Sequence, residues 1–208
     1  MMANLDKMCY IRFLHAIPGS QGVDILINDK EVAGNIGYKD FTEYYTACPG
    51  IYTLRAYPAG KRTDSVIDEH MELCEDVVYT AVAAGTNESP ELVLICDQNK
   101  KESYDDKACV RYVNLSPDSA GFNISMDSDA LSVNSLEYLE DTDYMTVAPG
   151  DYNIKIMDAA TGGTVAEHPG LKLKEDRYYA LCIVGLKEGH PELQILSPLE
   201  GITYLPIE

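Results

Sequence analysis

Residues 49–54 read "PGIYTL", and residues 149–154 read "PGDYNI". After each Pro-Gly pair every second residue is small or apolar: Tyr52, Leu54 and Ala56 in the first stretch, Tyr152, Ile154 and Ile156 in the second. An alternation of period two is typical of a strand with one buried face, because successive side chains of a strand point to opposite sides. The phrase therefore predicts one β-strand that occurs twice in the chain.

The repeat extends over nearly the whole chain of 208 residues. Three further pairs of segments match: 10–29 with 109–128, 73–85 with 173–185, and 90–95 with 191–196. The offset between matched residues drifts by only two, which predicts single-residue insertions in loops. We therefore expect a duplicated domain, with copies at 1–98 and 99–208 and a polar linker at 97–108.

Each copy is predicted to be all-β, because short alternating segments are separated by Gly, Pro, Asn and Asp at the spacing of a sandwich. In the first copy we expect about seven strands, at 9–15, 22–28, 38–46, 51–57, 65–73, 77–84 and 91–96. In the second we expect them at 109–115, 122–127, 132–138, 143–147 with 151–157, 164–173, 177–184 and 192–197. The expected fold is two tandem immunoglobulin- or transthyretin-like Greek-key β-sandwiches.

The segments "EDVVY" and "EDRYY" place Asp76 and Asp176 three residues before Tyr79 and Tyr179. This pattern resembles a tyrosine corner, in which the Tyr hydroxyl bonds back to a nearby backbone group and holds a crossover between sheets. We interpret both tyrosines as structural.

The formal net charge is −18, and acidic residues dominate both halves. Nucleic acids and anionic membranes attract clustered Lys and Arg, so neither is expected as a partner. No segment approaches the roughly 20 apolar residues that span a bilayer. The start lacks the basic and apolar regions of a signal peptide, which predicts a cytoplasmic protein.

The six cysteines do not form a disulfide framework that both copies share, since Cys48, Cys74 and Cys182 align with Ala148, Lys174 and Val82. No CxxC pair or zinc-type spacing occurs. We expect buried, reduced thiols that act as small apolar side chains.

The segments "VRYVNLSPDSAGFNISMD", "APGDYNIKIMDAATGGTV" and "DRYYALCIVG" resemble the bacterial domain-of-unknown-function family 4397. The pattern is V-R-x-x-H/N-x-x-P, then a Val-Asp strand, a Pro-Gly-x-Tyr strand and a late Tyr strand that ends in Gly. The first copy has His15 and Val23-Asp24, whereas the second has Asn114 and Phe122-Asn123. The resemblance implies an immunoglobulin- or transthyretin-like fold without established catalytic activity, in a family with many secreted or surface-attached members.

A search for catalytic motifs finds none that is complete. The four histidines (His15, His70, His168 and His190) are widely spaced, and the Asn114 counterpart of His15 favours a hydrogen-bonding role at a strand end. The G-x-S-x-G elbow is absent, and Arg55 occupies the place of the first Walker glycine. We assign no catalytic, cofactor-binding or metal-binding residue.

Two weaker features remain open. Asp127 and Asp129 begin "MDSDALS" like a calcium loop, but the later Gly and Glu are missing, so a solvated hairpin turn is favoured. The chain has 15 Tyr and no Trp, and an outward-facing subset could contact sugar or protein: Tyr44, Tyr45, Tyr57, Tyr112, Tyr138 and Tyr144.

We therefore expect a non-enzymatic binding or structural module that contacts protein or carbohydrate and needs no cofactor. The alternatives are a carrier of a small ligand or cation, and a hydrolase with paired carboxylates between the domains. The sequence does not determine the oligomeric state.

Overall fold

A computed structural model describes residues 8–97, 106–127 and 131–206. The chain divides into two compact units, of which the second spans Glu102–Thr203 and the first takes the rest, including Tyr204. The predicted boundary between residues 98 and 99, and most of the predicted linker, lie outside the described residues.

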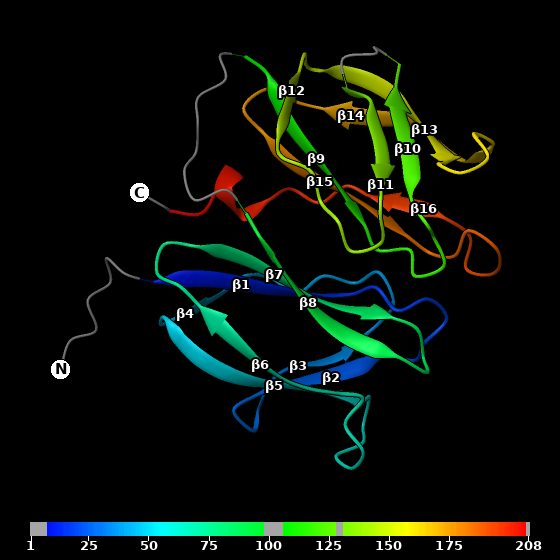
Figure 1. Cartoon of the computed structure of the whole chain (residues 1–208). Helices are drawn as coiled ribbons and strands as arrows, with labels where there is room; N and C mark the ends of the chain where they lie inside the picture. The colour runs from blue at the N-terminus through cyan, green and yellow to red at the C-terminus, as the bar shows by residue number, and fades with distance from the viewer. Residues whose placement is uncertain (1–7, 98–105, 128–130, 207–208) are drawn as a thin grey trace. The chain divides into compact units, whose positions relative to one another are not determined.

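The first unit contains eight strands in two four-stranded sheets (Figure 1). One sheet has the order β4-β1-β7-β8, with bounds Tyr45–Ala47, Cys9–His15, Val78–Gly85 and Pro90–Cys96. The other has the order β3-β2-β5-β6, with bounds Lys30–Ile36, Val23–Ile27, Gly50–Pro58 and Ile67–Leu73.

The second unit repeats this plan. One sheet has the order β12-β9-β15-β16, with bounds Met145–Val147, Ala108–Asn114, Tyr178–Val184 and Gln194–Leu196. The other has the order β11-β10-β13-β14, with bounds Val133–Leu136, Phe122–Met126, Gly150–Asp158 and Thr164–Leu173. The described residues add one short 3-10 turn, Gly201–Thr203, and no α-helix.

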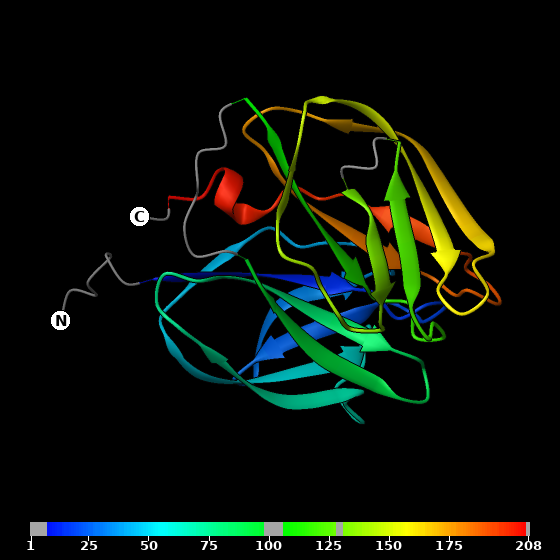
Figure 2. The ribbon, with the colours of Figure 1, turned by 45° about the horizontal axis from the view of Figure 1, so that its top comes forward.

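Each unit is a β-sandwich, as predicted, and the strand order favours the transthyretin-like alternative. The first and seventh strands are parallel neighbours, β1 with β7 and β9 with β15, and all other ladders are antiparallel. The division into four and four strands also differs from the four and three of an immunoglobulin constant domain. Figure 2 shows the two sheets of each unit lying face to face.

Each unit has its own apolar core. In the first unit the core joins Phe13 of β1 to Ile25 of β2 and Leu54 of β5. In the second it joins Tyr112 of β9 to Ile154 and Ile156 of β13. The alternation that follows Pro-Gly therefore buries its predicted face in both copies.

The Tyr of the Pro-Gly-x-Tyr phrase closes the turn that precedes its strand. The hydroxyl of Tyr52 donates to the carbonyl oxygen of Cys48 at 2.7 Å, and the hydroxyl of Tyr152 donates to that of Ala148 at 2.7 Å. A Cβ added to Gly150 would lie 3.4 Å from the Tyr152 ring, so glycine gives the ring room to reach back. The phrase thus encodes both a turn and the bond that holds it.

The tyrosine-corner interpretation is confirmed in both units. The Tyr79 hydroxyl accepts a hydrogen bond from the backbone N–H of Cys74 at 2.9 Å, and the Tyr179 hydroxyl accepts one from Lys174 at 3.1 Å. Each bond spans five residues and holds the crossover from β6 to β7, or from β14 to β15, against the sandwich.

One predicted strand is wrong. The expected strand at 38–46 is largely irregular, and the chain forms β3 at Lys30–Ile36 and the short β4 at Tyr45–Ala47 instead. The sequence pattern did not reveal β3, because Gly34 and Asn35 interrupt it. Asn35 has a left-handed φ of +51°, and the β2–β3 register shifts at this point. Each unit therefore has eight strands where about seven were expected.

The prediction that the cysteines are buried is wrong for half of them. Cys9, Cys109 and Cys182 are buried, whereas Cys48, Cys74 and Cys96 are exposed, and all six are free thiols. The exposed three lie at strand ends or in the turns that follow, where the chain leaves the core.

Candidate functional site

The edge strand β14 of the second unit shifts register twice against β13, and one of the shifts is an extra residue opposite Asn153. In the first unit β6 pairs regularly with β5 between Gly50↔Leu73 and Ala56↔Ile67. In the second, β13 pairs Tyr152 with Leu171 and Ile154 with His168, so Asn153 faces both Pro169 and Gly170. Two residues opposite one are a β-bulge. The insertion lies inside a strand, which corrects the expectation that every insertion falls in a loop.

Gly170 makes the bulge possible. Its φ is +72°, a left-handed conformation that glycine adopts without steric cost. Its N–H no longer pairs across the ladder and donates to the Asn153 side-chain oxygen at 3.1 Å. Pro169 has no N–H to leave unpaired, so the Pro-Gly pair suits this position.

The bulge borders a groove of 460 Å³ on the β11-β10-β13-β14 sheet of the second unit. We call it the bulge groove, and it is lined by residues of β10, β13 and β14 with Asp127: Ser125, Met126, Asp127, Asn153, Ile154, Lys155, Glu167 and Pro169. Met126 and Ile154 belong to the buried core, whereas most of the polar lining is exposed. The side chains of Met126 and Ile154 face the core, so the groove is polar and lies on the outer face of a rigid sheet.

Asn153 organises one wall of this groove. Its backbone N–H and its side-chain N–H both donate to Asp127 Oδ2, at 2.8 and 2.7 Å. With the bond from Gly170, its side chain links the end of β10 to the bulge in β14. The amide is therefore fixed in orientation before any ligand arrives.

The lining of the groove also carries an exposed ion pair. Lys155 Nζ lies 3.5 Å from Glu167 Oε1, and the two side chains are 48% and 64% exposed. Exposed pairs of this kind contribute about 0–1 kcal/mol. Both groups can therefore turn to a ligand at little cost.

The carboxylate of Asp127, the residue that follows β10, bonds to the neighbouring strand β13. Asn28, its counterpart in the first unit, accepts a hydrogen bond from the backbone N–H of Thr53 at 3.0 Å, as Asp127 does from Asn153. The hairpin turn predicted at Asp127 and Asp129 is not tested, because residues 128–130 lie outside the described residues. Within residues 8–97, 106–127 and 131–206, no group of three or more His, Cys, Asp or Glu is placed to hold a metal ion.

His15 is buried at the end of β1 and has a structural role. Its Nε2 lies 2.8 Å from Ser20 Oγ and 3.1 Å from the Gln21 carbonyl oxygen, next to a small cavity of 60 Å³. Burial lowers the pKa of His15, against the opposing effects of the Gln21 carbonyl and the Asp40 carboxylate.

Asn114 occupies the same place in the second unit. It donates to Ser119 Oγ and to the Leu136 carbonyl oxygen, at 2.8 and 3.0 Å. The two residues thus share a role in bonding the turn that follows the first strand, as the His/Asn exchange predicts.

The Asp/Asn exchange has a similar explanation. Asp24 accepts the N–H of Asn35 at 2.7 Å, and Asn123 accepts the N–H of Ser135 at 2.9 Å. Asp24 also binds Arg62 at 2.6 Å, and this hydrogen bond, followed by that from Asn35, lowers the pKa of Asp24. The Asp24 carboxylate is therefore occupied by the fold itself.

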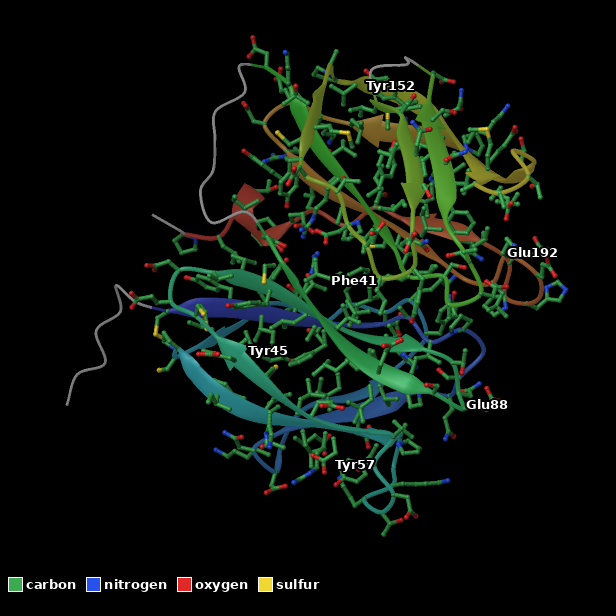
Figure 3. All side chains as sticks on the ribbon, viewed as in Figure 1. Phe41, Tyr45, Tyr57, Glu88, Tyr152 and Glu192 are labelled. Atoms are coloured by element: carbon green, nitrogen blue, oxygen red, sulfur yellow. The ribbon has the colours of Figure 1, made fainter. Side chains whose placement is uncertain are left out.

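The tyrosines named from the sequence do not form an outward-facing group. Tyr112 is fully buried and Tyr45 is 37% exposed, whereas Tyr44, Tyr57, Tyr138 and Tyr144 are half-buried. Figure 3 shows Tyr45 and Tyr57 at separate places on the first unit. None of the six lines the bulge groove.

The profile of one family matches the chain twice, at residues 9–124 and 108–200. Its description is "Domain of unknown function (DUF4397)". The chain belongs to the DUF4397 family. The resemblance inferred from the repeats is thereby confirmed, and each match contains one Pro-Gly-x-Tyr phrase and one tyrosine corner.

No curated protein matches this DUF4397 chain. Among solved structures, a family 26 carbohydrate-binding module from Eubacterium rectale Amy13K, in complex with maltoheptaose, is 10% identical, with 92% of this chain and 97% of that chain covered and a TM-score of 0.31. The Bacillus anthracis TIE protein is 15% identical, with 86% and 33% covered and a TM-score of 0.24.

A candidate adhesin from Bacteroides ovatus is 11% identical, with 92% and 95% covered and a TM-score of 0.24. At TM-scores below 0.5 these three similarities support no conclusion about a ligand. The part of the DUF4397 chain that the structure describes contains no helix with the length and hydropathy of a membrane span.

The bulge groove was not predicted from the sequence, although a signal for it exists. Asp68 and Glu167 occupy equivalent positions, and so do Met71 and Leu171. Two residues separate Asp68 from Met71, whereas three separate Glu167 from Leu171. An extra Pro-Gly pair inside an alternating strand is a known sign of a bulge.

Proposed function

We propose that this chain is a non-enzymatic binding module whose second unit holds a saccharide in the bulge groove. The observation that carries the proposal is the groove itself, a preformed polar recess of 460 Å³ on three adjacent strands. Its volume lies within the range of about 300–1,000 Å³ that small-ligand sites occupy.

The chemistry of the lining supports a ligand rich in hydroxyl groups. Sugar hydroxyls both donate and accept, so they need carboxylate or carbonyl acceptors together with amide or ammonium donors. Asp127 and Glu167 supply the acceptors, Lys155 supplies donors, and Ser125 supplies both. The exposed ring of Pro169 gives one apolar contact for the C–H face of a sugar ring.

The position of these groups on strands favours binding without large rearrangement. Asn153 is already fixed by Asp127 and Gly170, so a ligand would not have to order the backbone of this wall. Preorganisation of this kind raises affinity by lowering the entropy lost on binding.

The proposal is tested by removing the bulge. The variant Pro169→Glu with Gly170 deleted leaves one residue of β14 opposite Asn153, as in the regular β5–β6 pairing, and it should close the groove. A glycan array selects a neutral oligosaccharide that the unmodified chain binds, and isothermal titration calorimetry then measures its Kd. We expect the variant to weaken binding by at least tenfold.

The matched control is Arg55→Ala, on the equivalent face of the first unit. Arg55 occupies the place of Lys155 and pairs with Asp68 at 2.9 Å. This control should leave the Kd unchanged, and intact oligosaccharide should be recovered after long incubation. Equal loss of binding in both variants, an array without any signal, or cleavage of the sugar would overturn the proposal.

A further inference from the structure

Four cysteines from four different segments lie at one end of the first sandwich. Cys9 begins β1, Cys48 follows β4, Cys74 follows β6, and Cys96 ends β8. The topology brings them together, because the start of β1 and the ends of β4, β6 and β8 lie at one end of the paired sheets. We call this group the thiol end.

The strand register gives the adjacency in detail. Cys9 is the direct partner of Ala47 and donates its thiol to the Ala47 carbonyl oxygen at 3.2 Å. Cys96 is the direct partner of Tyr79 across β7 and β8. Cys9 therefore lies beside Ala47, the residue before Cys48. Cys96 lies beside Tyr79, whose hydroxyl accepts a hydrogen bond from the backbone N–H of Cys74.

Cys48 and Cys74 lie on the two sides of the end of the β5–β6 ladder. That ladder ends at Gly50↔Leu73; Cys74 directly follows Leu73, and Cys48 precedes Gly50 by two residues across the Pro49-Gly50 turn. Both thiols also contribute to the raised pKa of the Cys9 thiol, which places them near that residue.

The thiol end is a property of the first unit alone. The residues at the equivalent positions of the second unit are Ala108, Ala148, Lys174 and Leu199. The shared fold therefore does not require thiols at these places, and their presence in one copy calls for an explanation specific to that copy.

Exposure separates the four thiols into two kinds. Cys9 is buried, and burial, followed by the nearby Cys48 and then Cys74, contributes to a pKa raised to about 11. Little thiolate forms at such a site, so Cys9 is a poor nucleophile. Cys48 and Cys74 are exposed and can meet a reagent from solution.

We propose that Cys48 and Cys74 are a thiol–disulfide site that forms a reversible bond by exchange with a low-molecular-weight disulfide. One thiolate attacks the reagent disulfide, which forms a mixed disulfide and releases one reagent thiol. The second cysteine then attacks the mixed disulfide and releases the other reagent thiol. Two protein thiols are oxidised to one disulfide, and one reagent disulfide is reduced to two thiols.

The backbone at both cysteines is already held in place. The Cys48 carbonyl oxygen accepts the Tyr52 hydroxyl, and the Cys74 N–H donates to the Tyr79 hydroxyl. A bond between the two side chains would therefore join the Pro-Gly-x-Tyr turn to the tyrosine corner. It would close the chain from 48 to 74 and stabilise the first unit by restricting its unfolded state.

The test is to oxidise the full chain with oxidised glutathione, alkylate the remaining thiols, and map disulfides by mass spectrometry. Digestion with trypsin and an enzyme that cleaves after Glu separates Cys74 from Cys96, since Glu75 and Glu91 lie between them. We expect one linked peptide pair that joins Cys48 to Cys74. The thermal midpoint of the first unit should rise on oxidation and return when dithiothreitol is added.

The variants Cys48→Ser and Cys74→Ser should each abolish the linked pair and the rise in midpoint, whereas the control Cys96→Ser should keep both. All three side chains are exposed, so the substitutions should not disturb folding. Mixed glutathione disulfides alone, links that use Cys9 or Cys96 instead, or no link in the unmodified chain would each overturn the proposal. Since the bulge groove lies in the second unit, failure here leaves the saccharide proposal intact, and the reverse also holds.

Discussion

The hydroxyl of Tyr152 donates a hydrogen bond to the carbonyl oxygen of Ala148, four residues earlier, at 2.7 Å. The same bond joins Tyr52 to Cys48 at the same distance. Pro149 and Gly150 lie between the two ends of the bond, so the tyrosine closes the turn from which its own strand departs. The repeated phrase therefore encodes a strand together with the tyrosine that closes the turn before it (Figure 3 labels Tyr152).

Removing that hydroxyl should cost a small but measurable amount of stability. For Tyr152→Phe we expect a loss of about 1 kcal/mol, since a typical intramolecular hydrogen bond contributes about 0.5–1.5 kcal/mol and the site is half-buried. The change in unfolding free energy is measured by urea unfolding, with hydrogen exchange of the Ile154 amide as the probe. Tyr10→Phe serves as the control, and an unchanged free energy of unfolding for Tyr152→Phe would show that water replaces the bond fully.

The tyrosine corners should respond in the same direction. We expect Tyr79→Phe and Tyr179→Phe each to destabilise their own unit by about 1–2 kcal/mol, because the N–H of Cys74 or Lys174 loses its acceptor. Both N–H groups belong to exposed residues, so water limits the loss. Scanning calorimetry of the full chain measures the change, and identical thermograms for wild type and both variants would contradict the structural role.

Much of this fold follows from the sequence because the core faces alternate without interruption. The strand after each Pro-Gly pair was predicted within a residue or two, since Leu54 and Ile154 stand in clear period-two patterns. β3 was missed because Gly34 and Asn35 break its pattern, although the matching strand at 132–138 in the other copy was predicted. A comparison of the copies strand by strand would have recovered it.

The register of the last strands also departed from the sequence match. The match pairs 90–95 with 191–196, yet Ala83 lies opposite Leu92, whereas Ile183 lies opposite Ile195. The shift relative to the sequence match is by two residues, which keeps every side chain on its original face. A shift by two residues leaves the alternation of apolar and polar residues unchanged, so the sequence pattern could not reveal it.

The sequence signals the bulge through one extra residue, but it does not signal the groove, because the lining of the groove comes from three strands. Asn153 looks like any outward-facing residue of an alternating strand until Gly170 is seen to face it. The thiol end was hidden for a related reason, since its members are spread between residues 9 and 96. Only the strand order brings them to the same end of the sandwich.

The glycine that ends each late Tyr strand should tolerate no side chain. Gly185 has a φ of +100°, and a Cβ there would lie 2.3 Å from the Glu192 carbonyl oxygen. We expect Gly185→Ala to cost about 2–4 kcal/mol, because about 1 kcal/mol of backbone strain adds to an overlap that only a backbone shift relieves. Thermal unfolding of the full chain measures it.

Gly162→Ala is the matched control in the same unit. Gly162 has a φ of +70°, but a Cβ there would meet nothing within 4 Å. We expect a cost of about 1 kcal/mol from backbone strain alone. Equal costs for the two variants would show that the close approach of Glu192 is relieved without penalty.

His15 should make the first unit sensitive to mild acid. Burial lowers its pKa in the folded chain below the ordinary 6.5, so the unfolded chain binds a proton more readily. The stability contributed by neutral His15 is therefore present above pH 6.5 and is lost as the pH falls through the lower folded pKa. The thermal midpoint, measured from pH 7.5 to 5, should fall in wild type.

The variant His15→Asn copies the second unit and should remove that part of the pH dependence, since Asn114 makes the equivalent bonds without titrating. His168→Asn, at a half-buried position of β14, is the control and should leave the acid response of the first unit unchanged. An identical fall in midpoint for wild type and His15→Asn would show that the carboxylates, rather than this histidine, carry the response.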